Sequence, residues 1–149
     1  MAAIFLDTSA LVRRYDRTEV GSAMVHAVCA RSRGNDLIVA RHVTVEVASA
    51  FGRHEREGRK DAGTVARLWL TFQAHVRDQY QVIEITEAVF VRAEQLVFAH
   101  ELRASDAIHV SCALVGIGVV SAARMQFWTA DRRQADAASA EGLDVVMVR

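Results

Sequence analysis

The sequence contains no proline, only two cysteines and a single lysine, Lys60, among its 149 residues. Cys29 and Cys112 lie far apart, and neither belongs to a CxxC motif or a Cys/His cluster, which excludes a disulfide scaffold and the usual zinc motifs. The net charge is zero, so the chain lacks the strong positive charge that indicates a nucleic-acid-binding protein on its own. Composition alone therefore leaves the function open.

Long hydrophobic runs are also absent. Even the run VSCALVGIGVVSAA, residues 110–123, is shorter than the about 20 apolar residues that a membrane-spanning helix needs. The first residues, MAAIFLDTSALVRRY, reach an acidic side chain at Asp7 and lack the basic start and long apolar core of a signal peptide. We therefore expect a soluble, cytoplasmic protein with no membrane partner.

Short β-branched runs alternate with longer helical patterns, and no linker or repeat interrupts them, which predicts a single domain over residues 1–149. The expected strands are residues 3–6, 37–40, 81–85, 126–129 and 144–148. The expected helices are residues 9–15, 20–33, 43–57, 62–76, 87–100, 104–115 and 132–141. This alternation is typical of an α/β fold with three layers, in which helices cover both faces of a mainly parallel central sheet.

Three aspartates lie close to the ends of these elements. Asp7 follows the first strand in IFLDTSAL, and Asp131 follows the fourth strand in FWTADRRQ. Asp106 lies near the start of a helix in LRASDAIH, where Ser105 is an alternative cap. Each aspartate alone has an ordinary explanation as a helix cap. Together they matter more, because ligands of an open parallel sheet gather beyond the carboxyl ends of its strands.

Glu46 interrupts an otherwise apolar or small stretch, HVTVEVASAF. Its spacing places it on the same helical face as Val43 and Ala50, which are expected to face the core. A carboxylate turned toward a core needs a partner, a raised pKa or a metal ion, because an unpaired buried charge is costly. A buried arginine partner is the alternative to a metal ion, but Arg41 and Arg53, within seven residues of Glu46, fall on other parts of the surface if the helix is regular.

The four acids, Asp7, Glu46, Asp106 and Asp131, come from separate elements that an α/β fold can bring to one edge of the sheet. Four carboxylates in one cleft repel one another unless protons or cations neutralise them, and a set of oxygen ligands selects Mg²⁺ or Mn²⁺. The chemistry that suits such a site is metal-assisted hydrolysis of a phosphodiester.

The segments FLDTSALVRRY, VTVEVASAF, LRASDAIHVSCAL and FWTADRRQADAASAEGLDVV resemble, in order, the four motifs of the PIN domain, particularly its toxin branch, the VapC ribonucleases. The resemblance covers nearly the whole chain and implies a PIN-like fold. It further implies that Asp7, Glu46, Asp106 and Asp131 are the catalytic, metal-binding acids for Mg²⁺ or Mn²⁺. Ser9 and Thr129 match hydroxyl positions that orient the acids or waters.

The same resemblance implies an endoribonuclease that acts as the toxin of a toxin-antitoxin pair on an RNA substrate. Proteins of this kind usually form homodimers and are held inactive by a cognate antitoxin, here a VapB-like protein, whose C-terminal segment covers the acidic cleft. The alternatives are a PIN-like nuclease in RNA processing or DNA cleavage, and a non-catalytic α/β binding module that keeps the acids as caps.

Other residues near the motifs have less specific interpretations. Arg103 and Arg132 are the basic residues closest to the acids in sequence and are candidates for contacts with RNA phosphates. His109, three residues after Asp106, shares a helix face with it, and we expect it to be a packing residue. Trp128 is expected in the core rather than in base stacking.

Overall fold

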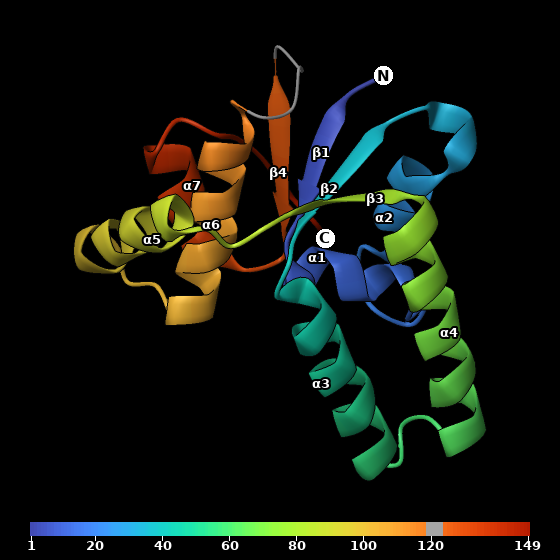
Figure 1. Cartoon of the computed structure of the whole chain (residues 1–149). Coiled ribbons are helices and arrows are strands. Elements are labelled where there is room, and N and C mark those ends of the chain that lie inside the picture. The colour runs from blue at the N-terminus through green and yellow to red at the C-terminus, as the bar shows by residue number, and fades with distance from the viewer. Residues whose placement is uncertain (119–123) are drawn as a thin grey trace.

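The computed structural model describes residues 1–118 and 124–149 and has a five-stranded sheet between two layers of helices (Figure 1). The strands are all parallel and lie in the order β3-β2-β1-β4-β5. Their bounds are β1 (Ala3–Leu6), β2 (Asp36–Ala40), β3 (Tyr80–Ile83), β4 (Met125–Thr129) and β5 (Asp144–Met147). The predicted three-layer α/β/α fold with a mainly parallel sheet is confirmed.

The helices divide between the two faces of the sheet (Figure 1). One face is covered by α1 (Thr8–Leu11), α2 (Ser22–Cys29), α3 (Val43–Arg56) and α4 (Ala62–Asp78). The other face is covered by α5 (Glu87–Ala99), α6 (Ala104–Gly116) and α7 (Arg132–Ala140). Strand β1 contributes side chains to the cores on both faces, because successive side chains of a strand point to opposite faces. Ile4 and Leu6 pack into the first core, whereas Ala3 and Phe5 pack into the second.

The strand order determines where a ligand can bind. From β1 the chain builds outward to β2 and β3 on one side and to β4 and β5 on the other, so the order reverses between β1 and β4. In open parallel sheets, the crevice beyond the carboxyl ends of the strands at such a reversal is the usual ligand site. The carboxyl ends of β1 and β4 are Leu6 and Thr129, directly before the segments that carry Asp7 and Asp131.

Two predicted helices are wrong in extent. The helix expected over residues 9–15 is α1 followed by a 3-10 turn, Val12–Arg14, and the helix expected over 20–33 is α2 followed by a separate 3-10 turn, Arg31–Arg33. Gly21 precedes α2 with φ 84°, and a Cβ there would lie 2.5 Å from Val148 Cγ1. The chain therefore makes a turn at this glycine, and the helix begins only at Ser22.

The long apolar run does not form a membrane span in the part that the structure describes. Within residues 1–118 and 124–149, no helix is both long enough and apolar enough to cross a bilayer. Residues 110–116 of the run belong to α6, whereas residues 119–123 lie outside the described part of the chain.

Candidate active site

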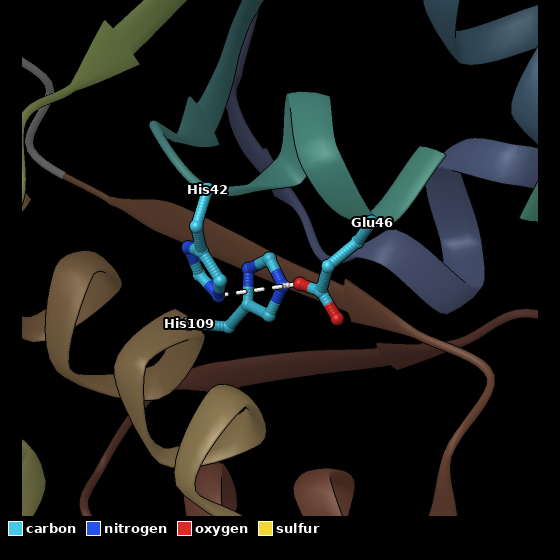
Figure 2. Close-up of side chains that lie close together, drawn as sticks. All are labelled: His42, Glu46 and His109. Carbon is cyan, nitrogen blue, oxygen red and sulfur yellow. Dashed lines mark hydrogen bonds and ion pairs between the residues drawn. The ribbon is translucent and has the colours of Figure 1, made fainter. Parts of the chain in front are cut away.

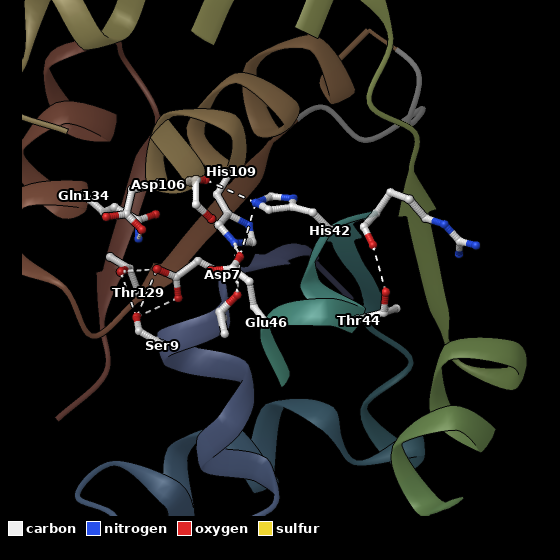
Figure 3. Close-up of polar contacts among 12 residues, drawn as sticks. Asp7, Ser9, His42, Thr44, Glu46, Asp106, His109, Thr129 and Gln134 are labelled. Carbon is white, nitrogen blue, oxygen red and sulfur yellow. Dashed lines mark hydrogen bonds and ion pairs between the residues drawn. The ribbon is translucent and has the colours of Figure 1, made fainter. Parts of the chain in front are cut away.

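Asp7 occupies the centre of the site, directly after β1. Its side chain is completely buried and accepts hydrogen bonds from Ala10 N at 2.8 Å, Ser9 Oγ at 2.8 Å and Thr129 Oγ1 at 2.6 Å (Figure 3). The bond from Ala10 makes Asp7 the N-cap of α1, so its predicted alternative role as a helix cap is confirmed. Burial raises the pKa of Asp7 above its ordinary value and outweighs the hydrogen bonds that lower it.

Ser9 and Thr129 connect the ends of β1 and β4 through Asp7. Ser9 Oγ also accepts a hydrogen bond from Ala130 N at 2.8 Å, and Thr129 Oγ1 accepts one from Asp131 N at 3.0 Å. The two hydroxyl oxygens lie 3.2 Å apart. These contacts fix Asp7 relative to the segment that carries Asp131, which is the orienting arrangement expected from the sequence.

Asp106 and Asp131 lie on the side of the site formed by α6 and α7, and Gln134 joins them. The backbone N–H of Gln134 donates to Asp131 Oδ1 at 3.1 Å, which makes Asp131 the N-cap of α7. The Gln134 side chain, 3% exposed, donates from Nε2 to Asp106 Oδ1 at 3.0 Å (Figure 3). Burial and the neighbouring Asp131 raise the pKa of Asp106. This repulsion marks a place for a cation.

The cap at the start of α6 differs from the sequence-based alternatives. The N-cap residue is Arg103, which makes no hydrogen bond of its side chain there, and Ser105 and Asp106 lie inside the first turn. Capping by Ser105 or Asp106 is therefore wrong. Because Asp106 does not cap its helix, its carboxylate is directed to other partners, of which Gln134 is one.

Glu46 reaches the site from α3 and is paired with hydroxyl and imidazole groups. Its Oε1 accepts from Thr8 Oγ1 at 2.9 Å, lies 2.6 Å from His109 Nε2 and lies 3.2 Å from His42 Nε2 (Figures 2 and 3). Partial burial raises the pKa of Glu46, but the hydrogen bonds and charge from His109 and the bond from Thr8 outweigh it and lower the pKa to about 2. The carboxylate form is thus strongly favoured.

The partners of Glu46 correct one expectation and extend another. The alternative of a buried arginine partner does not hold among the described residues: Arg41 lies near Glu84, with a nitrogen-oxygen distance of 4.0 Å, and the contacts of Glu46 come from histidines and threonine. His109 is buried as expected, at 1% exposed, and it also bonds to the acid. Its helical spacing from Asp106 placed it beside the site, but nothing in the sequence pointed to its bond with Glu46.

A cleft of about 340 Å³ opens over these groups. It is lined by Glu46, Asp106 and Asp131, together with the hydroxyl residues Thr8 and Ser9 and the basic residues Arg53 and Arg103 from its rim, among others. Asp7 is buried beneath its floor. The structure therefore brings the predicted acids together from four segments: the end of β1, α3, α6 and the start of α7.

A second hollow of about 290 Å³ adjoins the cleft and shares Arg103, Asp106 and Asp131 with it. Arg132 and Arg133 line only this second hollow. Arg132 is exposed. Among the described residues, its one ion pair with an acid is with Asp136, at a nitrogen-oxygen distance of 3.7 Å. Arg103 and Arg132, the candidates for phosphate contacts, thus lie beside the acids.

The residues of the cleft fit a hard divalent cation. Glu46, Asp106 and Asp131 offer carboxylate oxygens only, which is the donor set that Mg²⁺ and Mn²⁺ prefer. The pKa of Asp106 is raised by burial, by Asp131 and by the other acids, and a bound cation would relieve that repulsion.

Comparisons with known proteins agree with this geometry. The family model described as the PIN domain matches residues 4–140. Several solved structures are similar to this chain, and three of them are described in turn. VapC20 from Mycobacterium tuberculosis, described as a sarcin-ricin loop cleaving toxin, has a TM-score of 0.62 at 17% identity, with 99% of both chains covered.

The second is FitAcB from Neisseria gonorrhoeae, with a TM-score of 0.68 at 13% identity and 95% of both chains covered. The third is VapBC2 from Rickettsia felis, bound to a DNA fragment from its promoter, with a TM-score of 0.67 at 11% identity; 97% of this chain and 98% of that chain are covered. No curated protein sequence matches this chain. At these identities the structural likeness establishes the fold.

Proposed function

The chain belongs to the PIN domain family, and we propose that it is a metal-dependent endoribonuclease that acts as the toxin of a toxin-antitoxin pair. The observation that carries this proposal is the cleft in which Glu46, Asp106 and Asp131 meet above the buried Asp7. Helix capping accounts for Asp7 and Asp131 but not for Asp106 and Glu46, so no single structural task explains why all four acids gather at that edge of the sheet. They do have a common chemical task, which is to hold a divalent cation beside a phosphodiester.

In this proposal, the four acids Asp7, Glu46, Asp106 and Asp131 hold Mg²⁺ or Mn²⁺, with Asp7 as the buried member of the set. A bound cation of this kind lowers the pKa of a water and stabilises the charge that develops on the phosphate. The protein residues supply the rest. Gln134 holds Asp106 in place, and Ser9 and Thr129 hold Asp7, so that the carboxylates are oriented before the substrate arrives.

Arginine side chains support RNA as the substrate. Arg53 lines the cleft, Arg103 lines both hollows, and Arg132 and Arg133 line the second hollow. These guanidinium groups are suited to bidentate contacts with phosphates on either side of the scissile bond. The acidic centre and its basic rim explain how a chain of zero net charge can bind a polyanion.

The assignment as a toxin draws on the similar structures. One of them is named VapC20 and described as a sarcin-ricin loop cleaving toxin, and two others are named VapBC2 and FitAcB. By this similarity, the partner is a VapB-like antitoxin whose arginine or C-terminal segment enters the acidic cleft, and the protein acts in the cytoplasm. We also propose a homodimer, which the exposed apolar side chains of α5, such as the 93% exposed Phe98, support.

The test is cleavage of a mixed RNA pool, with a DNA pool in parallel, in the presence of Mg²⁺, Mn²⁺ or EDTA. The purified protein is compared with the Asp7→Asn, Asp106→Asn double variant and with Asp136→Asn, whose carboxylate is exposed and outside the cleft. We expect metal-dependent cleavage of RNA by the parent and by Asp136→Asn, and none by the double variant. Cleavage that survives EDTA, or equal activity of the double variant, would refute the proposal, and a preference for DNA would make the protein a different nuclease.

A further inference from the structure

Glu46 is the one acid of the cleft whose carboxylate is bonded to imidazoles among the described residues. Three donor groups converge on the same oxygen, Oε1: Thr8 Oγ1 at 2.9 Å, His109 Nε2 at 2.6 Å and His42 Nε2 at 3.2 Å. They come from α1, from α6 and from the residue before α3. Figure 2 shows the second oxygen of Glu46 pointing away from both imidazole rings.

The contacts determine which imidazole atoms carry protons. His42 Nε2 lies 3.2 Å from the backbone oxygen of Ser105 as well as 3.2 Å from Glu46 Oε1. Both neighbours can only accept a hydrogen bond, so His42 Nε2 carries a proton. His109 Nε2 lies 2.6 Å from Glu46 Oε1, a distance at which a proton must lie between the nitrogen and the carboxylate. His109 therefore directs its N–H toward Glu46, whereas the N–H of His42 is hydrogen-bonded to the Ser105 carbonyl and lies close to the carboxylate.

This protonation separates two possible roles of the cluster. His42, Glu46 and His109 can place ligand atoms within 4.8 Å of one another, which is close enough to surround a metal ion. A protonated Nε2 has no lone pair to give to a metal, so the proton would have to move to Nδ1. In the part of the chain that the structure describes, Nδ1 of both rings is buried without a hydrogen-bond partner, whereas a metal-bound histidine normally donates its other N–H to an acceptor. The contacts favour hydrogen bonding over metal ligation.

We propose that His109 and His42 are positioning residues that hold Glu46 by Oε1 and leave Oε2 as the atom that binds the divalent cation. This proposal rests on the proposed function, because it names how one acid of that site is oriented. His109 makes the short contact, and His42 packs against it, with ring centroids 4.1 Å apart.

The physical advantage is preorganisation. The last torsion of a glutamate side chain is broad and soft, so a free carboxylate samples many orientations. Anchoring one oxygen to groups from three segments restricts that motion, and partners behind a metal ligand typically change metal affinity by about 10-fold to 100-fold when they are removed. His109 is 1% exposed, so packing fixes the donor itself.

The experiment compares His109→Leu, which removes the donor and keeps an apolar side chain, with His109→Gln, whose amide nitrogen can replace Nε2. His26→Gln, on α2 and outside the residues that line the cleft, is the control. Mn²⁺ affinity is measured by electron paramagnetic resonance, RNA cleavage gives kcat and KM separately, and thermal melting reports folding. Asp106→Asn is included as a variant of the site itself.

We expect His109→Leu to weaken Mn²⁺ binding about 10-fold and to lower kcat with little change in the KM for RNA. His109→Gln should recover most of both losses, and His26→Gln should match the parent. A merely structural role of His109 would lower the melting temperature without this recovery by the amide and without a loss of metal affinity.

Two results would overturn the positioning role. If His109→Leu binds Mn²⁺ as tightly as the parent, while Asp106→Asn binds it more weakly, His109 has no positioning role. The proposed function would remain intact. A nitrogen hyperfine coupling from imidazole in the spectrum of bound Mn²⁺ would make the histidines direct ligands instead. If the parent binds no Mn²⁺, or if Asp106→Asn binds it equally well, the proposed function itself fails.

Discussion

The two walls of the cleft treat their carboxylates in opposite ways. On the Glu46 wall, formed by Glu46 with Thr8, His42 and His109, hydrogen-bond donors surround the acid and lower its pKa to about 2. On the aspartate wall, formed by Asp106, Asp131 and Gln134, the backbone N–H of Gln134 bonds Asp131 and its side-chain amide bonds Asp106, and burial and the repulsion from Asp131 raise the pKa of Asp106.

The difference teaches which part of the site a cation would change most. Glu46 is already compensated by protein groups, so a bound ion has little repulsion to relieve there. Asp106 lacks such compensation, because burial and the neighbouring Asp131 and Asp7 raise its pKa. The metal-free protein therefore stores unfavourable electrostatic energy on the aspartate wall, in the manner of many functional sites.

The largest expected effect comes from breaking the aspartate wall. Asp106→Asn should lower RNA cleavage by about 100-fold or more, because it removes a proposed metal ligand. Removing only a residue that supports a metal ligand typically costs about 10-fold to 100-fold, and removing the ligand itself should cost at least as much. The melting temperature of the metal-free variant should be equal to or above that of the parent, since the repulsion from Asp131 is gone. Cleavage assays and melting curves in EDTA measure both, and a less stable, fully active variant would contradict the comparison.

The next effect is stabilisation by the cation. Mn²⁺ at about 100 times its dissociation constant should raise the free energy of unfolding by about 2.7 kcal/mol, because it binds the folded site. Most of that gain should disappear in Asp106→Asn at the same concentration. Thermal melting with and without Mn²⁺ measures it, with Asp136→Asn as the matched control. A gain of the same size in both variants would place the cation elsewhere.

A smaller effect is expected from the Glu46 wall. Glu46→Gln keeps the shape of the side chain but exchanges charge-assisted hydrogen bonds for neutral ones, so the free energy of unfolding of the metal-free protein should fall by about 1 kcal/mol. Urea unfolding measures the change. Glu55→Gln, exposed on the same helix, should have no comparable effect. The sign is opposite to that expected for Asp106→Asn, which makes the pair of variants a direct test of the comparison.

The smallest effect is the pH dependence of stability in EDTA. The pKa of Glu46 is lowered from 4.5 to about 2, so its contribution is complete above pH 4.5 and is lost as the pH falls toward 2. The pKa values of Asp7 and Asp106 are raised from 3.8, so the folded state holds their protons more tightly, and stability falls as the pH rises through their folded pKa values. In Glu46→Gln, the free energy of unfolding should depend less on pH between about 2 and 4.5. In Asp106→Asn, it should depend less on pH above 3.8. Identical profiles for the two variants would remove the electrostatic contrast.

The fold could be predicted from the sequence because its inner strands β1 and β2 are buried on both faces. Runs such as AIFL and LIVA are continuously apolar, as a parallel strand between two helical layers must be, and they became β1 and β2. The helices were harder, because the turns after α1 and α2 depend on tertiary packing. Gly21 alone does not indicate how closely Val148 approaches it from the other end of the chain.

The candidate site could be predicted in its acids but not in their partners. Asp7, Glu46, Asp106 and Asp131 stand out by local position, since each occurs beside a strand end or on an apolar helix face. Their partners depend on contacts between distant segments. His109 lies 63 positions from Glu46, and Thr8 lies 38 positions from it, so no local pattern predicts that they meet on one oxygen.

Gln134 shows the same limit at shorter range. Its backbone N–H donates to the N-cap Asp131, three residues earlier, and this spacing is visible in the sequence. Its side chain contacts Asp106 on another helix, and only the packing of α6 against α7 creates that contact. The acids were predictable as chemistry, and their arrangement required the fold.

The most direct test of the acidic cleft as a cation site is a calorimetric titration of Mn²⁺ into the parent protein, Asp106→Asn and Asp136→Asn. The account predicts saturable binding by the parent and by Asp136→Asn, and at least about 10-fold weaker binding by Asp106→Asn. Equal binding by all three proteins, or no binding by the parent, would contradict it.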